Sequence, residues 1–187
     1  LYTMLHHTKR HIIWVFALFL ISCEGNSPTH DQPSLMQKSA KRGVSFNFTN
    51  IQDLPLLSPA ISWSYNWAND QNSTSALWFD TNEMDFCPMC WNGSYSAAKI
   101  RQYVQEHPNT KYLLGFNEPN LTDQCNMTPA QAAEQWPQVV ALARELNLKL
   151  ISPAMNYGTL AGYHDPIKWL DEFFAQPNVS LDDIHAI

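Results

Sequence analysis

The sequence is poor in cysteine, and this shortage excludes one class of site. Of four cysteines, only Cys87, Cys90 and Cys125 follow the N-terminal 40 residues. Cys87 and Cys90 form a Cys-x-x-Cys pair, but no second cysteine pair or nearby histidine completes the four ligands of a structural zinc site. We therefore expect no metal centre. Three thiols permit one disulfide and one free cysteine.

Positive charge is also scarce. The chain carries 11 Lys and Arg against 17 Asp and Glu, a formal net charge of −6. Without the first 40 residues, 8 basic and 15 acidic residues remain, which is a net charge of −7. Because proteins that bind nucleic acids present basic surfaces to the phosphate backbone, this composition argues against nucleic acid as a partner.

The N-terminus has an apolar run that is too short to span a membrane. Residues 12–21 are ten apolar residues that follow the basic stretch "HHTKRH", which is the layout of a secretory signal. The run ends in "LISC" at Cys23, which resembles a bacterial lipobox. We expect a signal peptide at 1–23, lipidation of Cys23, and an exported protein that is membrane-anchored at the cell surface or in the periplasm, or secreted. An ordinary signal peptide with an incidental Cys23 is the alternative.

The segment 24–40 is polar, contains two prolines and has no hydrophobic period, so it is predicted to be a flexible tether. The folded domain is predicted at 41–187. Short apolar segments alternate there with amphipathic ones, which is typical of a parallel α/β sheet. The expected strands are "GVSFNF" (43–48), "AISWSYNW" (60–67), "MDFCPM" (84–89), "KYLLGF" (111–116), "LKLISPA" (148–154) and "DDIHAI" (182–187).

Two helices carry clear start signals. The helix after Thr128 has Pro129 at its first position and Gln131 where a capping box requires it. A second helix repeats the device with Asp165 and Pro166. Trp136 and Trp169 fall on the apolar faces of these helices, so we expect them to be packing residues.

The pattern predicts a (β/α)8 TIM barrel, truncated after about five to six strands. A complete barrel needs roughly 200 to 250 residues, and 41–187 supplies 147. A complete doubly wound sheet is the alternative fold. In a barrel, the residues just past the carboxyl ends of the strands line the active site.

Polar and aromatic residues gather at those expected strand ends. Such residues suit a sugar ligand, since pyranose faces stack on aromatic rings while amides bond the hydroxyl groups. The aromatic candidates are Trp63, Tyr65, Trp67, Trp91 and Tyr157, and their polar partners are Asn66, Asn92 and Asn156. A core role is the alternative for each tryptophan.

Six motifs in order give a specific resemblance: "RGVSFNF", "ISWSYNW", "FCPMCW", "LLGFNEPN", "NMTPAQAAEQWP" and "LKLISPA". From about Arg42 onward the chain resembles the glycosyl hydrolase catalytic core family, glycoside hydrolase family 128, whose members are endo-β-1,3-glucanases of the clan A type. The resemblance implies a TIM barrel, no cofactor and a retaining mechanism with two glutamates. It implies that Glu118 is the general acid/base and that Asn117 holds the substrate 2-hydroxyl. The nucleophilic Glu is then expected at strand seven, beyond the chain end.

The chemistry independently requires a residue such as Glu118. Glycosidic cleavage needs a proton for the leaving oxygen, and a retaining enzyme also needs a carboxylate about 5 to 5.5 Å from the acid. Pro119 stiffens the turn that presents Glu118. The alternative is that Glu118 caps or salt-bridges a loop. Asp80, Glu83 and Asp85 precede a strand at its wrong end, and Glu172 lies on the outer face of a helix, so none is a convincing nucleophile.

These observations predict a retaining endo-β-1,3-glucanase for laminarin-like glucans, acting as a monomer on a β-glucan polysaccharide. It would contact the membrane only through a lipid anchor. The alternatives are a noncatalytic glycan-binding surface lipoprotein on the same barrel, and a clan A glycosidase for another β-glucan or a mannan. A disulfide is expected between Cys90 and Cys125, whose loops are neighbours in a barrel, with Cys87 and Cys125 as the competing pair.

Overall fold

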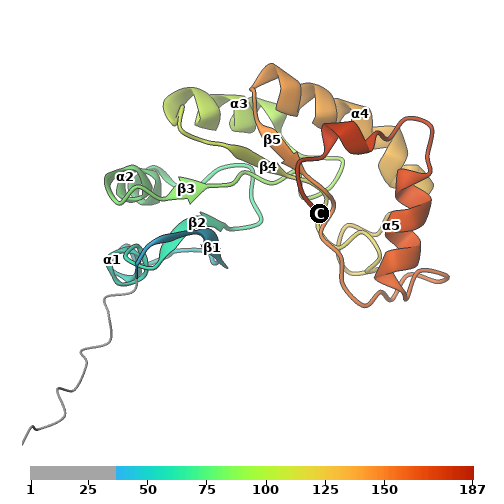
Figure 1. Ribbon diagram of the computed structural model, residues 1–187, viewed down its shortest axis with the longest axis horizontal. Helices are drawn as coiled ribbons and strands as arrows, with labels where there is room; N and C mark the ends of the chain where they lie inside the picture. The colour runs from blue at the N-terminus through green and yellow to red at the C-terminus, as the bar shows by residue number, and fades with distance from the viewer. Residues whose placement is uncertain (1–36) are drawn as a thin grey trace, which may run out of the picture. The chain divides into compact units, whose positions relative to one another are not determined.

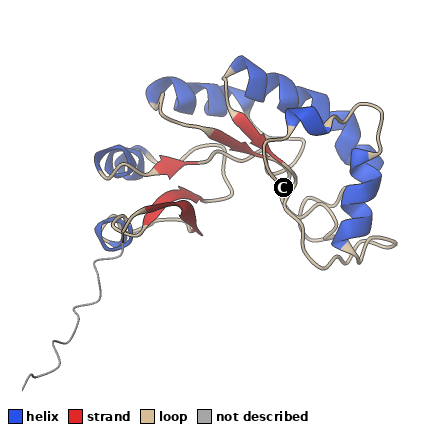
Figure 2. Cartoon of the chain, viewed as in Figure 1, coloured by secondary structure: helices blue, strands red, loops and turns tan. Residues whose placement is uncertain are grey.

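The computed structural model describes residues 37–187. The signal peptide expected at 1–23, its Cys23 and most of the tether expected at 24–40 lie outside these residues. Strands and helices alternate along the described part (Figures 1 and 2). The strands are β1 (Ser39–Ser45), β2 (Ile61–Tyr65), β3 (Asp85–Phe86), β4 (Tyr112–Leu114) and β5 (Lys149–Ile151).

All paired strands run parallel. One sheet has the order β1-β2-β3, and a second sheet pairs β4 with β5. A parallel bridge between Met89 and Leu114 joins the chain after β3 to β4. The parallel α/β fold expected from the sequence is therefore confirmed, whereas the strands of residues 37–187 do not close into a barrel.

The two ends of the domain differ from expectation. Strand β1 covers Ser39–Ser45 rather than 43–48, so it begins inside the segment assigned to the tether. The expected sixth strand at 182–187 is not formed as such: its first two residues belong to a 3-10 turn at Leu181–Asp183, which begins where the Ser180 hydroxyl accepts the N–H of Asp182. Only a single bridge, from Ile151 to Ala186, continues the sheet there.

Except for the first, the helices begin at polar caps that can be read in the sequence, whereas Gln52, before the first helix, makes no side-chain capping hydrogen bond. They are α1 (Asp53–Leu57), α2 (Ser73–Thr81), α3 (Ala97–Glu106), α4 (Pro129–Glu145) and α5 (Pro166–Phe174). Thr128 and Gln131 form the predicted capping box of α4, and Asp165 caps α5. None of the helices within residues 37–187 is both long enough and apolar enough to cross a membrane.

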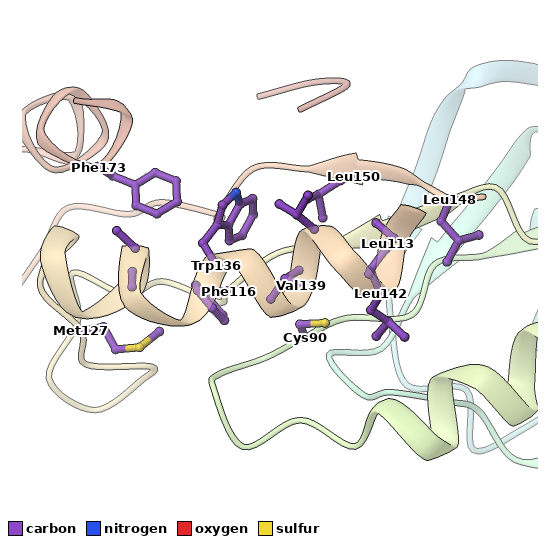
Figure 3. Packing of buried hydrophobic residues seen from close by; sticks show 14 of the residues in the cluster. Cys90, Leu113, Phe116, Met127, Trp136, Val139, Leu142, Leu148, Leu150 and Phe173 are labelled. Carbon is purple, nitrogen blue, oxygen red and sulfur yellow. The ribbon is translucent and has the colours of Figure 1, made fainter. Parts of the chain in front are cut away.

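Aromatic packing joins α4 and α5 to β4. The Trp136 ring lies edge-on to Phe116, 5.5 Å away, and to Phe173, 5.3 Å away (Figure 3). The Trp169 ring stacks on Phe173, and its Nε1–H donates to the carbonyl of Met127 at 2.9 Å. Both tryptophans are wholly buried, so the prediction that they are packing residues is confirmed. This core supports β4 and the chain that leads from it to Glu118.

Candidate active site

The backbone at the carboxyl end of β4 is held from both sides. Beyond Leu114, the parallel pairing continues as Asn117 N–H donates to the Trp91 carbonyl and Glu118 N–H to the Ala154 carbonyl, each at 2.9 Å. Ala154 N–H donates in turn to the Phe116 carbonyl at 2.9 Å. Asn117 and Glu118 therefore lie between the chain after β3 on one side and the chain after β5 on the other.

Glu118 has a backbone conformation that is uncommon for its residue type. Its φ is +46°, in the left-handed region, where a residue with a Cβ is disfavoured by roughly 1 to 2 kcal/mol. Pro119, which is fully buried, follows it, and the Pro119 carbonyl accepts the N–H of Met127 at 2.8 Å. The surrounding hydrogen bonds thus hold a sharp turn at the point where the carboxylate is presented.

Glu118 is half-buried, and among residues 37–187 its carboxylate accepts one hydrogen bond. Asn156, on the loop after β5, donates from Nδ2 to Glu118 Oε1 at 3.1 Å. The salt bridges formed within residues 37–187 do not include Glu118, so the alternative of a loop salt bridge has no partner there. The structure brings Glu118 and Asn156 together, as expected for two residues at neighbouring strand ends.

Asn117 is 5% exposed, and its side chain contacts a residue that the sequence had not singled out. Its Nδ2 donates to Gln124 Oε1 at 3.0 Å. Gln124 belongs to the same loop after β4, where Cys125 N–H also donates to the Asn117 carbonyl at 3.3 Å. The sequence shows only that Gln124 follows Asn117 by seven residues. Loops have no regular repeat of side-chain directions, so this spacing does not predict the contact.

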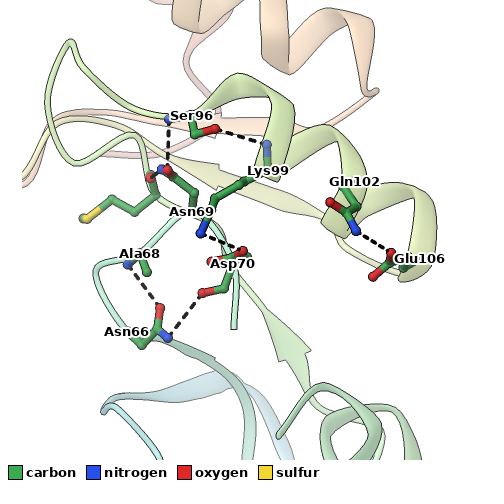
Figure 4. A network of polar contacts seen from close by, with 9 residues as sticks. Asn66, Ala68, Asn69, Asp70, Ser96, Lys99, Gln102 and Glu106 are labelled. Carbon is green, nitrogen blue, oxygen red and sulfur yellow. Dashed lines mark hydrogen bonds and ion pairs between the residues drawn. The ribbon is translucent and has the colours of Figure 1, made fainter. Parts of the chain in front are cut away.

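Trp67 stands on an anchored loop after β2. Its side chain is 41% exposed, and its ring lies edge-on to Tyr65 at 5.4 Å. Asn66 closes the turn by accepting the N–H of Ala68 at 3.1 Å (Figure 4). Asn69 fastens the loop to the chain after β3, donating to the Met89 carbonyl at 2.8 Å and accepting Ser96 N–H at 2.9 Å. An exposed indole on a fixed loop is suited to stacking.

The remaining aromatic candidates lie in three different settings. Trp63 lies within β2, before its carboxyl end. Together with Tyr65 it lines an apolar hollow of about 400 Å³ on the face of the sheet. Trp91 is half-buried beside Asn117, and Tyr157 is 85% exposed next to Asn156. The Asn92 side chain closes a local turn by accepting Ser94 N–H at 2.9 Å.

Other carboxylates have partners of their own. Asp85 opens β3 and pairs with Lys111 at 2.6 Å, while Asp80 contacts His107 at 2.9 Å. Both lie towards the amino end of β3, opposite to Glu118. Glu172 accepts a hydrogen bond from the Tyr163 hydroxyl at 2.8 Å. In residues 37–187, no group of three His, Cys, Asp or Glu side chains is arranged to hold a metal ion.

The three cysteines of the described chain are free thiols, so the disulfide expected between Cys90 and Cys125 is not formed in this structure, nor is the competing pair. Cys90 is wholly buried in the core beside α4, whereas Cys125 is half-buried on the loop after β4. Burial raises the pKa of the Cys90 thiol and raises that of Cys125 to about 12. Such thiols stay protonated and weakly nucleophilic at neutral pH.

Comparison with known families settles what kind of protein carries this site. Residues 43–187 match the model of the glycosyl hydrolase catalytic core family. The chain belongs to this family. The resemblance drawn from the six sequence motifs is therefore confirmed. A comparison with curated protein sequences found no match.

Solved structures similar to this family member are enzymes of glycoside hydrolase family 128. A subgroup II endo-β-1,3-glucanase from Pseudomonas viridiflava is 42% identical, with a TM-score of 0.69 and coverage of 74% of this chain and 54% of that chain. The Sorangium cellulosum subgroup II endo-β-1,3-glucanase is 36% identical, with a TM-score of 0.63 and the same coverage.

A third similar structure contains bound sugar. It is a variant of a subgroup I endo-β-1,3-glucanase from Amycolatopsis mediterranei in complex with laminaritriose and laminaribiose. It is 30% identical, with a TM-score of 0.52 and coverage of 73% of this chain and 51% of that chain. The chain thus spans about half the length of the solved relatives that it matches.

Proposed function

We propose that this member of the glycosyl hydrolase catalytic core family is part of a retaining endo-β-1,3-glucanase for laminarin-like glucans, with Glu118 as general acid/base. The observation that carries the proposal is the turn at Glu118, which presents a half-buried carboxylate at the carboxyl end of a parallel strand. The similar endo-β-1,3-glucanases support the substrate class. The parallel strands and helices are consistent with part of a (β/α)8 barrel.

The proposed reaction uses Glu118 twice. Glu118 first gives its proton to the glycosidic oxygen as that oxygen's bond to the anomeric carbon breaks, and a second carboxylate bonds to the same carbon. Ionised Glu118 then takes a proton from the water that cleaves this ester. This chain spans about half the length of its solved relatives. We place the second carboxylate in the part of the enzyme that corresponds to the other half.

Neighbouring side chains would bind the glucan. Asn117, beside Glu118, is proposed to contact the sugar 2-hydroxyl, with Gln124 holding its amide. Trp67, Trp91 and Tyr157 would stack on sugar rings. Aromatic side chains combine a large apolar face with a fixed shape, which suits them to this role.

The first test measures reducing-sugar release from laminarin by the full-length protein. Glu118→Gln keeps the size of the side chain but removes the transferable proton, so we expect a loss of about 10²- to 10⁴-fold. Glu134→Gln is the matched control, because Glu134 is exposed on α4 and makes no salt bridge within residues 37–187. An unchanged rate in Glu118→Gln would remove Glu118 from the mechanism.

Two further measurements test whether the enzyme retains the anomeric configuration and whether Glu118 acts as the general acid/base. Proton NMR of the first product should show the β-anomer if the configuration is retained, and the α-anomer would exclude a retaining mechanism. Azide should restore turnover of an activated aryl laminarioside by Glu118→Ala, because azide needs no base to attack. Binding of laminarin without any cleavage by the wild type would instead favour a noncatalytic glycan-binding protein.

Export belongs to the same proposal. Residues 1–23 would direct secretion, and lipid on Cys23 would anchor a monomeric enzyme at the cell surface or in the periplasm. Incorporation of labelled palmitate by the wild type but not by Cys23→Ala is expected. Equal labelling of the two proteins would contradict the anchor.

A further inference from the structure

The turn that carries Glu118 is fastened to the loop after β5 by a buried amide. Asn120 is wholly buried, and its Nδ2 donates to the carbonyls of Asn156 at 2.6 Å and Tyr163 at 3.3 Å. Its own carbonyl accepts the N–H groups of Thr159 at 3.0 Å and Leu160 at 2.9 Å. These four hydrogen bonds tie the backbone of the loop, including Asn156, to the turn after β4.

The loop after β5 leaves space for the Asn120 side chain because residue 158 is a glycine. A Cβ at Gly158 would lie 2.6 Å from Asn120 Nδ2 and would overlap the Tyr163 carbonyl oxygen, so only glycine leaves room for the contact. Asn120 Oδ1 is buried and has no hydrogen-bond partner among residues 37–187. An unpaired buried polar atom disfavours folding by about 1 to 3 kcal/mol. Asn120 therefore occupies this position at a penalty in stability.

The orientation of the Asn156 side chain follows from its other contact. Its Oδ1 accepts the backbone N–H of Tyr157 at 2.8 Å. Because the backbone N–H can only donate, the amide oxygen must face Tyr157 and the NH₂ group must face Glu118. Nδ2 donates to Glu118 Oε1 at 3.1 Å. Oε1 therefore acts as an acceptor in this arrangement.

We propose that Asn156, held in place by Asn120, is a positioning residue that selects which oxygen of Glu118 delivers the proton. With Oε1 accepting from Asn156, the proton of the neutral carboxyl group sits on Oε2. Oε2 then gives this proton to the glycosidic oxygen, which leaves with the electron pair of the broken bond. This inference rests on the proposed role of Glu118, and it replaces the expectation that Asn156 simply binds sugar.

The test compares two substrates that differ in their need for a proton. In laminarin the leaving group is a sugar hydroxyl, which must be protonated. In a 2,4-dinitrophenyl β-laminaribioside the leaving group is dinitrophenolate, which departs without protonation. Asn156→Asp keeps the size of the side chain and its contact with Tyr157 N–H but removes the donor to Oε1. We expect kcat/KM on laminarin to fall by about tenfold to a hundredfold, as for a misplaced catalytic group. On the dinitrophenyl substrate, the change should stay below about threefold.

Two further variants complete the design. Asn156→Ala should show the same selective loss, and because the side chain is exposed, both variants should fold with an unchanged melting temperature. Asn109→Ala is the control, since Asn109 lies exposed in the loop before the amino end of β4, opposite to the site. It should leave both substrates unaffected.

The outcomes separate this inference from the proposed function. Equal losses on both substrates through a raised KM would mean that Asn156 binds sugar, and no loss on either would mean that it does not act. Either result overturns the positioning role of Asn156. If Glu118→Gln is inactive in the same experiment, the proposed role of Glu118 still stands. If Glu118→Gln is fully active, the proposed function itself has failed.

Discussion

Glu118 donates its backbone N–H to the carbonyl of Ala154 at 2.9 Å while its own φ is +46°. One residue therefore both completes the parallel pairing between β4 and the chain after β5 and turns sharply out of the strand. Left-handed backbone at a residue other than glycine is disfavoured unless its surroundings enforce it. Here the strain coincides with the carboxylate proposed to do the chemistry.

This strain gives a prediction about stability. Asparagine adopts left-handed backbone more readily than glutamate or glutamine. In urea unfolding, Glu118→Asn should therefore be more stable than Glu118→Gln by about 0.5 to 1 kcal/mol, a fraction of the penalty for this conformation. Both variants lose the carboxylate, so their difference reports the backbone. Equal unfolding free energies would show that the turn is not strained.

Trp67 should contribute to glucan affinity without stabilising the fold. Its exposed ring contacts Tyr65, and the loop is anchored independently through Asn69. In a Glu118→Gln background, Trp67→Ala should weaken laminarihexaose binding by about 1 to 2 kcal/mol in calorimetry, while the melting temperature stays unchanged. Trp67→Phe should retain part of the affinity. Leu77→Ala, an exposed apolar residue on α2, is the control, and an equal effect there would argue against stacking by Trp67.

Alkaline pH should destabilise the protein through Cys87. Burial, assisted by Asp85, raises the pKa of the Cys87 thiol from 9.0 to about 12. Between these values the unfolded chain releases the proton while the folded chain keeps it, so stability present below pH 9 is lost as the pH rises towards about 12.

The matched variant for this effect is Cys87→Ala. Urea unfolding at several pH values should show a steeper loss of unfolding free energy in the wild type than in the variant. Parallel pH profiles would mean that the thiol does not titrate differently in the two states.

Local signals account for the parts of the fold that were predicted well. Thr128 with Gln131, and Asp165 with Pro166, define helix starts through contacts within three residues, so α4 and α5 begin where the sequence indicated. Strand limits depend on partners far along the chain. That is why β1 begins at Ser39 and why the segment after Asp183 forms only an isolated bridge.

The sequence by itself determined the alternation of strands and helices, the family, and the position of Glu118 after β4, because hydrophobic period, capping residues and motif order are properties of short segments. Only the tertiary structure decided that Asn156 hydrogen-bonds Glu118, that Asn120 is buried beneath that contact, and that Trp63 lies on the sheet face. The hydrogen bond joins residues 38 positions apart. Such contacts arise when parallel strands place their carboxyl ends side by side, and spacing along the chain does not encode them.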